Sequence, residues 1–166
     1  REKLKRMIVQ RMESLRLDTL EQYLPLLQSN RLSAGEEWEN IIQCVTVGES
    51  FFFRDSPQFD LLRNEILPDL IRKNKNGNRL RIWSAGCSTG EEPYSLAMTL
   101  YELLPNPKDW DVNILGTDIN KASLEKAKQG TYGTWSFRQV NQNTIDRFFE
   151  WDDPCWRVKS DFRKMV

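Results

Sequence analysis

The first 46 residues place apolar side chains with the period of an α-helix. Leu4, Ile8 and Met12 recur at helical spacing, which predicts a helix with one buried face. A second helix is predicted to begin at Asp18, because Asp18 and Glu21 have the spacing of a capping box. We therefore expect an all-helical N-terminal domain over residues 1–46.

Residues 47–78 are expected to form a linker and a helix that lead into the next domain. Ser56 is a natural N-cap and Pro57 a natural first helical residue, and a helical apolar pattern follows them. The polar run RKNKNGN at 72–78 is the clearest boundary signal in the middle of the chain.

Residues 79–166 begin with strands and helices in alternation. LRIW precedes a glycine loop and a helix that opens at Glu91, and VNILGT runs into Asp118 before a helix that Gly130 closes. This order predicts an α/β fold with a parallel sheet. The tail is expected to add one short strand at 156–162.

The predicted parallel sheet has two clear strands, and two strands leave apolar surface open. We therefore expect that the chain carries the N-terminal part of a Rossmann-like domain, truncated before its remaining strands. The alternative is association with another chain that completes the sheet.

Composition narrows the chemistry. The 166 residues include no histidine, so the chain cannot by itself build a Ser-His-Asp or Cys-His unit, and common zinc and iron sites are disfavoured. We assign no metal ligands. Three cysteines without C-x-x-C spacing are typical of cytoplasmic free thiols. The formal net charge is zero and apolar runs are short, so neither nucleic acid binding nor membrane insertion is expected.

The glycine loop fits two kinds of function. Gly86, Ser88 and Gly90 match the G-x-S-x-G pattern of a hydrolase nucleophile elbow, but a chain without histidine has no imidazole to activate Ser88. The same loop, after the first strand of a βαβ unit, presents backbone N–H groups to a nucleotide-like ligand. We favour the ligand-binding loop.

The acids around this loop indicate the ligand. Asp118 ends the second strand, where a carboxylate can accept both ribose hydroxyls; its alternative role is to cap the following helix. Glu91 and Glu92 complement the helix dipole but repel a pyrophosphate, which disfavours a nicotinamide-dependent oxidoreductase. They suit a ligand with a cationic end and no phosphate, such as S-adenosylmethionine. Capping alone is the alternative for one of the two glutamates.

The chain resembles the chemotaxis receptor methyltransferases, the CheR family. The resemblance covers nearly all of the chain, and it implies a small helical domain followed by a Rossmann-like methyltransferase domain. It also implies methyl transfer from S-adenosylmethionine to glutamate side chains of chemotaxis receptors, with S-adenosylhomocysteine as product. It is carried by FFFRD (51–55), WSAGCSTGEEPYSLAM (83–98), LGTDIN (115–120) and AKQGTY (127–132).

The resemblance implies roles for individual residues. Arg54 would be the catalytic residue and would lie near the transferred methyl group and the methionine end of the cofactor. Ser50 falls where the family has a threonine that touches the cofactor, and Gly48 where a member carries an asparagine, so the sequence departs from the family at both positions. The other cofactor-binding residues would be Gly86 for backbone approach, Glu92 for the charged amino-acid end and Asp118 for the ribose.

The implied reaction suits a chain without histidine. A glutamate side chain is ionised at neutral pH, because its unperturbed pKa is about 4.3, and the sulfonium is already an activated methyl donor. Catalysis then depends on positioning, and Arg54 is expected to orient the incoming carboxylate by a fork-like contact. A surface ion pair with Asp55 is the alternative role for Arg54.

The predicted helix at 1–16 is basic, with six positive and two negative side chains. It is either a solvated face or a docking surface for the acidic cytoplasmic helices of receptors. A second function stays open for the whole chain. A truncated or degenerate relative would sense the cofactor or dock receptors without turnover, and this chain itself is expected to be weakly active or inactive.

Overall fold

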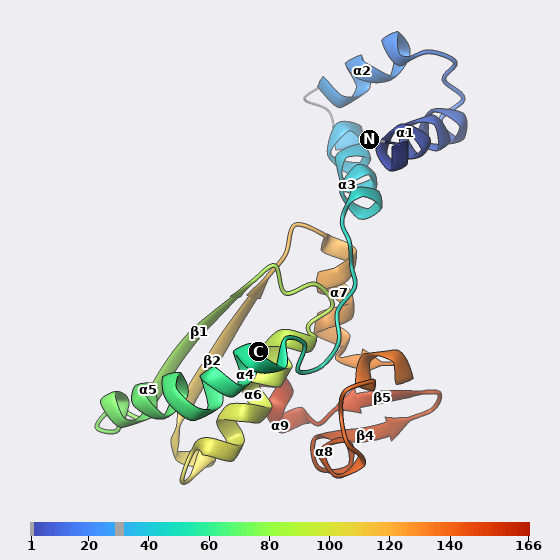
Figure 1. Cartoon of the computed structure of the whole chain (residues 1–166). Helices are drawn as coiled ribbons and strands as arrows, with labels where there is room; N and C mark the ends of the chain where they lie inside the picture. The colour runs from blue at the N-terminus through green and yellow to red at the C-terminus, as the bar shows by residue number, and fades with distance from the viewer. Residues whose placement is uncertain (1, 29–31) are drawn as a thin grey trace. The chain divides into compact units, whose positions relative to one another are not determined.

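The computed structural model describes residues 2–28 and 32–166, which form two compact units (Figure 1). The first unit comprises residues 1–48 with 119–122, and the second comprises 49–118 with 123–166. No helix in the described part of the chain is both long and apolar enough to cross a membrane.

The first unit consists of three helices, α1 (Glu2–Ser14), α2 (Leu20–Gln28) and α3 (Leu32–Val45). Its core is small and contains Met7, Met12, Tyr23 and Ile41. Leu4 is 43% exposed, so the buried face of α1 is narrower than the predicted stripe. Helix α2 begins later than the predicted Asp18, because the Asp18 and Thr19 N–H groups donate to Gln22 Oε1 at 2.9 and 3.3 Å.

A buried acid joins the three helices of the first unit. Glu37, on α3, is 3% exposed and accepts from Arg11 Nη2 on α1 and from Tyr23 Oη on α2, each at 2.6 Å. The Arg11 guanidinium holds the pKa of Glu37 below its usual value. The charge of Arg11 is therefore neutralised by Glu37 within the unit. Arg11 does not belong to the basic docking surface that we predicted.

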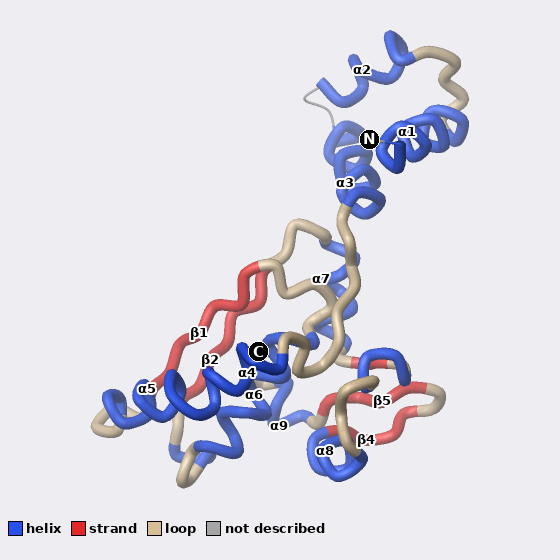
Figure 2. Tube along the Cα trace, in the orientation of Figure 1, coloured by secondary structure: helices blue, strands red, loops and turns tan. Residues whose placement is uncertain are grey.

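The second unit contains two separate sheets (Figure 2). β1 (Arg79–Ala85) and β2 (Asp111–Thr117) pair in parallel, with Ala85 beside Thr117 at their carboxyl ends, which confirms the predicted parallel pair. The second sheet is antiparallel, in the order β3-β5-β4. Its strands come from the tail: β3 (Thr131–Tyr132), β4 (Phe149–Asp152) and β5 (Cys155–Val158). The sequence indicated one strand only, at 156–162. That prediction is confirmed to Val158 by β5 and is wrong beyond it, because a helix begins at Ser160.

Helices cover one face of the parallel sheet. Helices α5 (Leu67–Asn74) and α6 (Glu91–Leu103) lie alongside β1 and β2 (Figure 1), and Leu80 and Ile114 of the strands are buried in this core. On the other face, Trp83 is 69% and Leu115 58% exposed. The sheet therefore leaves apolar surface open, as a two-stranded sheet is predicted to do.

The helix before β1 is continuous but irregular. α4 (Ser56–Leu61), a π-turn (Leu62–Ile66) and α5 follow one another without a break. Ser56 is already helical, and Asp55 occupies the N-cap in a left-handed conformation with φ 58°. The predicted cap at Ser56 is therefore wrong by one residue.

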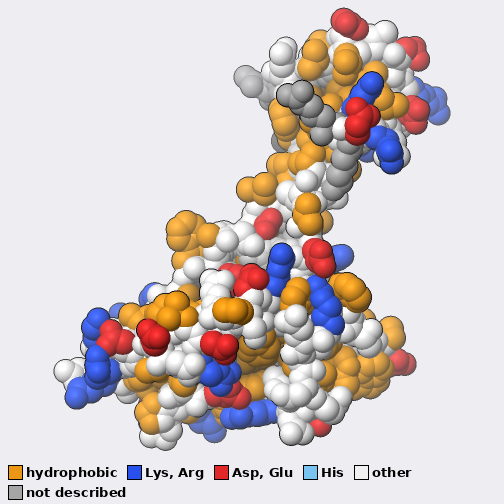
Figure 3. Space-filling model, viewed as in Figure 1, with side chains coloured by type: hydrophobic (Ala, Val, Ile, Leu, Met, Phe, Trp, Pro, Cys, Tyr) orange, Lys and Arg blue, Asp and Glu red, His pale blue; other side chains and the backbone are white. Residues whose placement is uncertain are grey.

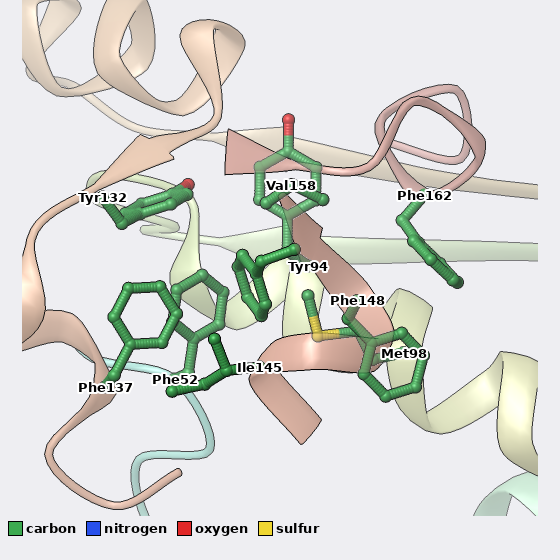
Figure 4. Close-up of a cluster of buried hydrophobic side chains, with 10 residues drawn as sticks. Phe52, Tyr94, Met98, Tyr132, Phe137, Ile145, Phe148, Val158 and Phe162 are labelled. Atoms are coloured by element: carbon green, nitrogen blue, oxygen red, sulfur yellow. The ribbon is translucent and has the colours of Figure 1, made fainter. Parts of the chain in front are cut away.

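A second core joins α6 to the antiparallel sheet. Tyr94 and Met98 of α6 lie next to Phe52 and Phe148 in this cluster (Figure 4). The Phe52 and Phe137 rings are stacked with centroids 5.2 Å apart. The unit also contains α7 (Lys121–Gln129) from residue 123 onward, α8 (Gln142–Phe148) and α9 (Ser160–Arg163), with 3₁₀ turns at Pro107–Asp109 and Thr134–Phe137.

Candidate cofactor site

The glycine loop lies where β1 and β2 end. The N–H groups of Gly86 and Cys87 donate to the Thr117 carbonyl at 2.7 and 2.9 Å, so the loop is fastened to the end of the neighbouring strand. Gly90, with φ 94°, opens α6, and a Cβ there would lie 2.8 Å from the Ala127 Cβ. Only glycine fits this position without a shift of α7.

Asp118 is bonded to the loop. The Ser88 N–H donates to Asp118 Oδ2 at 2.8 Å, which ties the residue after β2 to the middle of the loop. The carboxylate is partly exposed and therefore accessible to a ligand at the strand ends, where parallel α/β sheets bind nucleotides.

Glu92 is bonded to the end of β1, just before the glycine loop. It lies in the first turn of α6 and is exposed, and the buried Ser84 hydroxyl donates to its Oε1 at 2.7 Å. Ser84 precedes Gly86 by two positions and Ser88 follows it by two. Glu92 and Asp118 are therefore bonded to the residues two positions before and two positions after Gly86.

Glu91 is a structural acid. It is 2% exposed and accepts from Thr89 Oγ1 at 2.6 Å and from Ser136 Oγ at 3.0 Å. A carboxylate at this position complements the helix dipole while it joins the loop to the 3₁₀ turn at 134–137. The adjacent glutamates therefore have different environments.

The loop is open and lies in a negative field. A Cβ added to Gly86, whose φ is 76°, would meet no described atom within 4 Å. Burial and the charges of Asp118, Glu92 and Glu91 raise the pKa of the Cys87 thiol. The field that disfavours a thiolate at Cys87 favours a cationic ligand in the open space beside the loop.

The nucleophile-elbow alternative does not fit this loop. Ser88 has a left-handed backbone with φ 49°. Its Oγ is buried and makes no hydrogen bond within the described part of the chain. A hydroxyl that neither a base nor a substrate reaches is not a nucleophile.

The FFFRD segment is fastened to the start of α6. The Phe53 N–H donates to Ser95 Oγ and the Phe52 N–H to the Ser136 carbonyl, both at 3.0 Å. Phe53 and Asp55 have φ values of 56° and 58°. Aspartate adopts this left-handed conformation readily, but a bulky phenylalanine does so only when its surroundings hold it there. The backbone is therefore strained at Phe53, directly before Arg54.

Arg54 and Ser50 both belong to this segment. Arg54 is exposed, and its Nη1 donates to the Glu49 carbonyl at 2.8 Å. Ser50 is half-buried. Phe52 is part of the core and Phe51 lies under Arg138, so these two rings have structural partners within the unit.

Residues 48–166 match the family model described as CheR methyltransferase, SAM binding domain. The chain belongs to the CheR methyltransferase family. It is 32% identical over 160 residues to chemotaxis protein methyltransferase 2 of Vibrio cholerae, across 96% of this chain and 54% of that protein. It is 36% identical over 143 residues to the chemotaxis protein methyltransferase of Escherichia coli, across 86% and 46%. The chain therefore spans about half the length of these curated relatives.

The site of this CheR-family chain fits the S-adenosylmethionine that the matched domain binds. Two carboxylates and an open glycine backbone suit a ribose and a cationic end, and the acids at the helix start oppose a phosphate. Within the described residues, no cluster of three or more Cys, Asp or Glu could hold a metal ion.

Sequence reasoning missed the serines that assemble this site. Ser84 holds Glu92, Ser95 holds the FFFRD backbone, and Ser136 holds both Phe52 and Glu91. Ser95 stands inside the EEPYS motif, one turn after Glu91, and this spacing could have revealed it. Ser136 comes from an irregular stretch without a sequence signal.

Proposed function

We propose that the protein transfers a methyl group from S-adenosylmethionine to glutamate side chains on the cytoplasmic helices of chemotaxis receptors. The observation that supports the proposal is the bonding of Glu92 to Ser84, at the end of β1, and of Asp118 to Ser88, in the glycine loop that follows β1. Family membership supplies the reaction class.

We assign the cofactor contacts to five residues on this basis. Asp118 accepts from the ribose hydroxyls, Glu92 faces the charged amino-acid end, and Gly86 lets the ligand approach the backbone. Ser50 and Arg54, on the segment held by Ser95 and Ser136, contact the methionine end.

Catalysis in this proposal is positioning. The bound cofactor supplies an activated methyl group. Arg54 orients the attacking glutamate by a charge-assisted contact, and the receptor glutamate needs no base because it is already ionised at neutral pH. A well-oriented pair of reactants is worth up to roughly 7–11 kcal/mol, so a chain without histidine has a sufficient route to catalysis.

Arg54→Ala tests the role of this residue in the full-length gene product. We expect the rate of methyl transfer to receptor fragments to fall by about a hundredfold, while affinity for S-adenosylhomocysteine changes by about twofold or less. Tritiated methyl transfer, with release of methanol by base, measures the rate and identifies a carboxylate as acceptor. Equal losses of rate and affinity would contradict the role, and cofactor binding without any transfer by the wild type would favour a binding module.

The exposed basic side chains of α1 and its end are proposed to dock the receptor. Lys5, Arg6 and Arg16 are exposed, whereas Arg11 pairs with Glu37. Basic and acidic side chains are interspersed on the viewed faces of both units (Figure 3), so the docking role rests on these three exposed basic side chains. Reversal of these three charges to Glu should abolish receptor association and leave cofactor affinity unchanged; pull-down that persists after the reversal would refute the docking role.

A further inference from the structure

Arg138 is held from several directions beside the segment that carries Arg54. Its guanidinium carbon lies 3.5 Å from the centre of the Phe51 ring and 4.5 Å from that of Trp135. Its Nη1 donates to the Trp135 carbonyl at 2.9 Å, and its Nη2 pairs with Glu49 Oε1 at 3.2 Å. The side chain is 22% exposed, so its orientation is well restrained.

Glu49 connects Arg138 to Arg54. The Glu49 carboxylate binds Arg138, and the Glu49 carbonyl accepts from Arg54 Nη1 at 2.8 Å. The Arg54 guanidinium also lies 5.9 Å from the same Phe51 ring. Two arginines therefore share one glutamate and one aromatic ring, but they use different groups of that glutamate.

The carboxylate of Glu49 is a competitor for Arg54. An arginine fork binds a carboxylate in two-pronged fashion more strongly than it binds a single carbonyl, and Glu49 already lies within reach of Arg54 through its main chain. Loss of Arg138 would leave this carboxylate without its cation. Arg54 could then turn from the carbonyl to the carboxylate, and its fork would be occupied before a substrate arrives.

We propose that Arg138 is a positioning residue: it occupies the Glu49 carboxylate and so keeps the Arg54 guanidinium available for the carboxylate of the substrate. The inference rests on the proposed role of Arg54. The backbone geometry supports the inference. Arg138 directly follows the 3₁₀ turn at 134–137, and the Ser136 carbonyl of that turn accepts a hydrogen bond from the Phe52 N–H. The Ser136 carbonyl thus restrains the backbone at Phe52, and Arg138 restrains the side chain of Glu49.

The test uses Arg138→Ala, Glu49→Gln and the double variant in the full-length gene product. Arg138→Ala should lower kcat for methylation of receptor fragments by about tenfold and change affinity for S-adenosylhomocysteine by about twofold or less. Adding Glu49→Gln removes the competing charge and should restore kcat to within about threefold of wild type. A purely structural role would make the double variant slower than Arg138→Ala, and that result would overturn the proposal, as would an unchanged kcat in Arg138→Ala.

Arg147 provides a matched control in the same unit. Arg147 lies on α8. Its Nη1 pairs with Glu102 at 3.0 Å, and its guanidinium lies 5.0 Å from the centre of the Phe148 ring. Like Arg138, it therefore combines an ion pair to a glutamate with a contact to an aromatic ring. Arg147→Ala should leave kcat within about twofold of wild type. If Arg138→Ala does not fold, Arg138→Gln removes the charge, keeps a polar side chain of similar reach, and is subject to the same criteria.

An NMR measurement separates this inference from the proposed reaction. The Arg54 Nε–H signal, assigned with Arg54→Lys, should shift in Arg138→Ala, return toward its wild-type position in the double variant, and stay in place in Arg147→Ala. An Arg54 signal that Arg138→Ala does not move would overturn the inference. The expected shifts in a protein that never transfers methyl groups would refute the proposed reaction and leave the coupling of the two arginines established.

Discussion

The two units hold their acids in different ways. In the helical unit, Glu37 is buried against a cation and a hydroxyl, from Arg11 and Tyr23. In the second unit, Glu92 is exposed and accepts from the neutral hydroxyl of Ser84. A cation cancels the charge of the acid it binds, whereas a neutral donor orients the acid and leaves its charge in place.

The difference separates an acid that stabilises a fold from one that we propose to recognise a ligand. The bonds of Glu37 point inward and join three helices. Those of Glu92 and Asp118 fix two carboxylates at the rim of an open loop. Glu91 shows that sequence position alone does not decide the role, because it is next to Glu92 and yet is buried with two hydroxyl donors.

The largest expected effect comes from breaking the structural acid. Glu37→Gln leaves the Arg11 guanidinium without its counter-charge in a site where Glu37 is 3% exposed. We expect the free energy of unfolding of the helical unit to fall by about 3 kcal/mol. Amide exchange in α1–α3 measures the change. The exposed Glu36→Gln is the control, and a loss of cofactor affinity in Glu37→Gln would contradict the division between the units.

A pair of adjacent variants sharpens the comparison. Glu92→Gln should weaken binding of S-adenosylhomocysteine by about 2 kcal/mol, or roughly thirtyfold, because it removes a charge that faces the ligand. Glu91→Gln should instead lower the free energy of unfolding of the second unit by about 1–2 kcal/mol, because its acid holds Thr89 and Ser136. Calorimetry and thermal unfolding of both variants measure the two effects. If both variants behave alike, the distinction fails.

Acid should unfold the helical unit through Glu37. Its pKa is lowered in the folded unit, chiefly by the hydrogen bond from Arg11, so its stabilising contribution is present above the unfolded value of about 4.3. That contribution is lost as the pH falls through the lower, folded pKa. Unfolding of α1–α3, followed between about pH 6 and about pH 2, should show this loss in the wild type. Glu37→Gln should have a flatter profile, and parallel profiles would exclude Glu37 as the titrating group.

The smallest effect concerns the neutral donor. Ser84→Ala removes the hydroxyl that orients Glu92 but retains the negative charge. We expect binding of S-adenosylhomocysteine to weaken by about 1 kcal/mol, roughly fivefold, and calorimetry measures it. In a Glu92→Gln background, Ser84→Ala should weaken binding of S-adenosylhomocysteine by less, because residue 92 no longer carries a charge for the hydroxyl to orient. Equal costs in both backgrounds would show that the hydroxyl acts independently of Glu92.

The parallel pair of strands could be predicted because its signals are local. LRIW and VNILGT are short apolar runs, each followed by a loop and a helix, and this order predicts a parallel pair. The antiparallel sheet could not be predicted in the same way. β3 is only two residues long, and residues 131–153 carry no regular apolar pattern that could report the pairing of Tyr132 with Trp156.

The site was predictable to the extent that its residues belong to compact motifs. Gly86, Glu92 and Asp118 follow or open regular elements, so their meeting at the strand ends follows from topology. The capping positions at Asp18 and Ser56 were wrong by one or two residues, because Gln22 and a left-handed Asp55 compete with the expected caps. Arg138 follows an irregular turn, and its place beside Phe51 depends on tertiary packing alone.

The central claim is that Glu92, whose bond from the neutral Ser84 hydroxyl leaves its negative charge in place, selects the ammonium group of a phosphate-free nucleoside. Calorimetry of wild type and Glu92→Gln against S-adenosylhomocysteine and methylthioadenosine, which lacks the amino-acid end, tests it most directly. We predict that wild type prefers S-adenosylhomocysteine by about tenfold or more and that Glu92→Gln loses most of that preference while still binding methylthioadenosine. An equal preference in both proteins, or tighter binding of NAD than of S-adenosylhomocysteine by the wild type, would contradict the account.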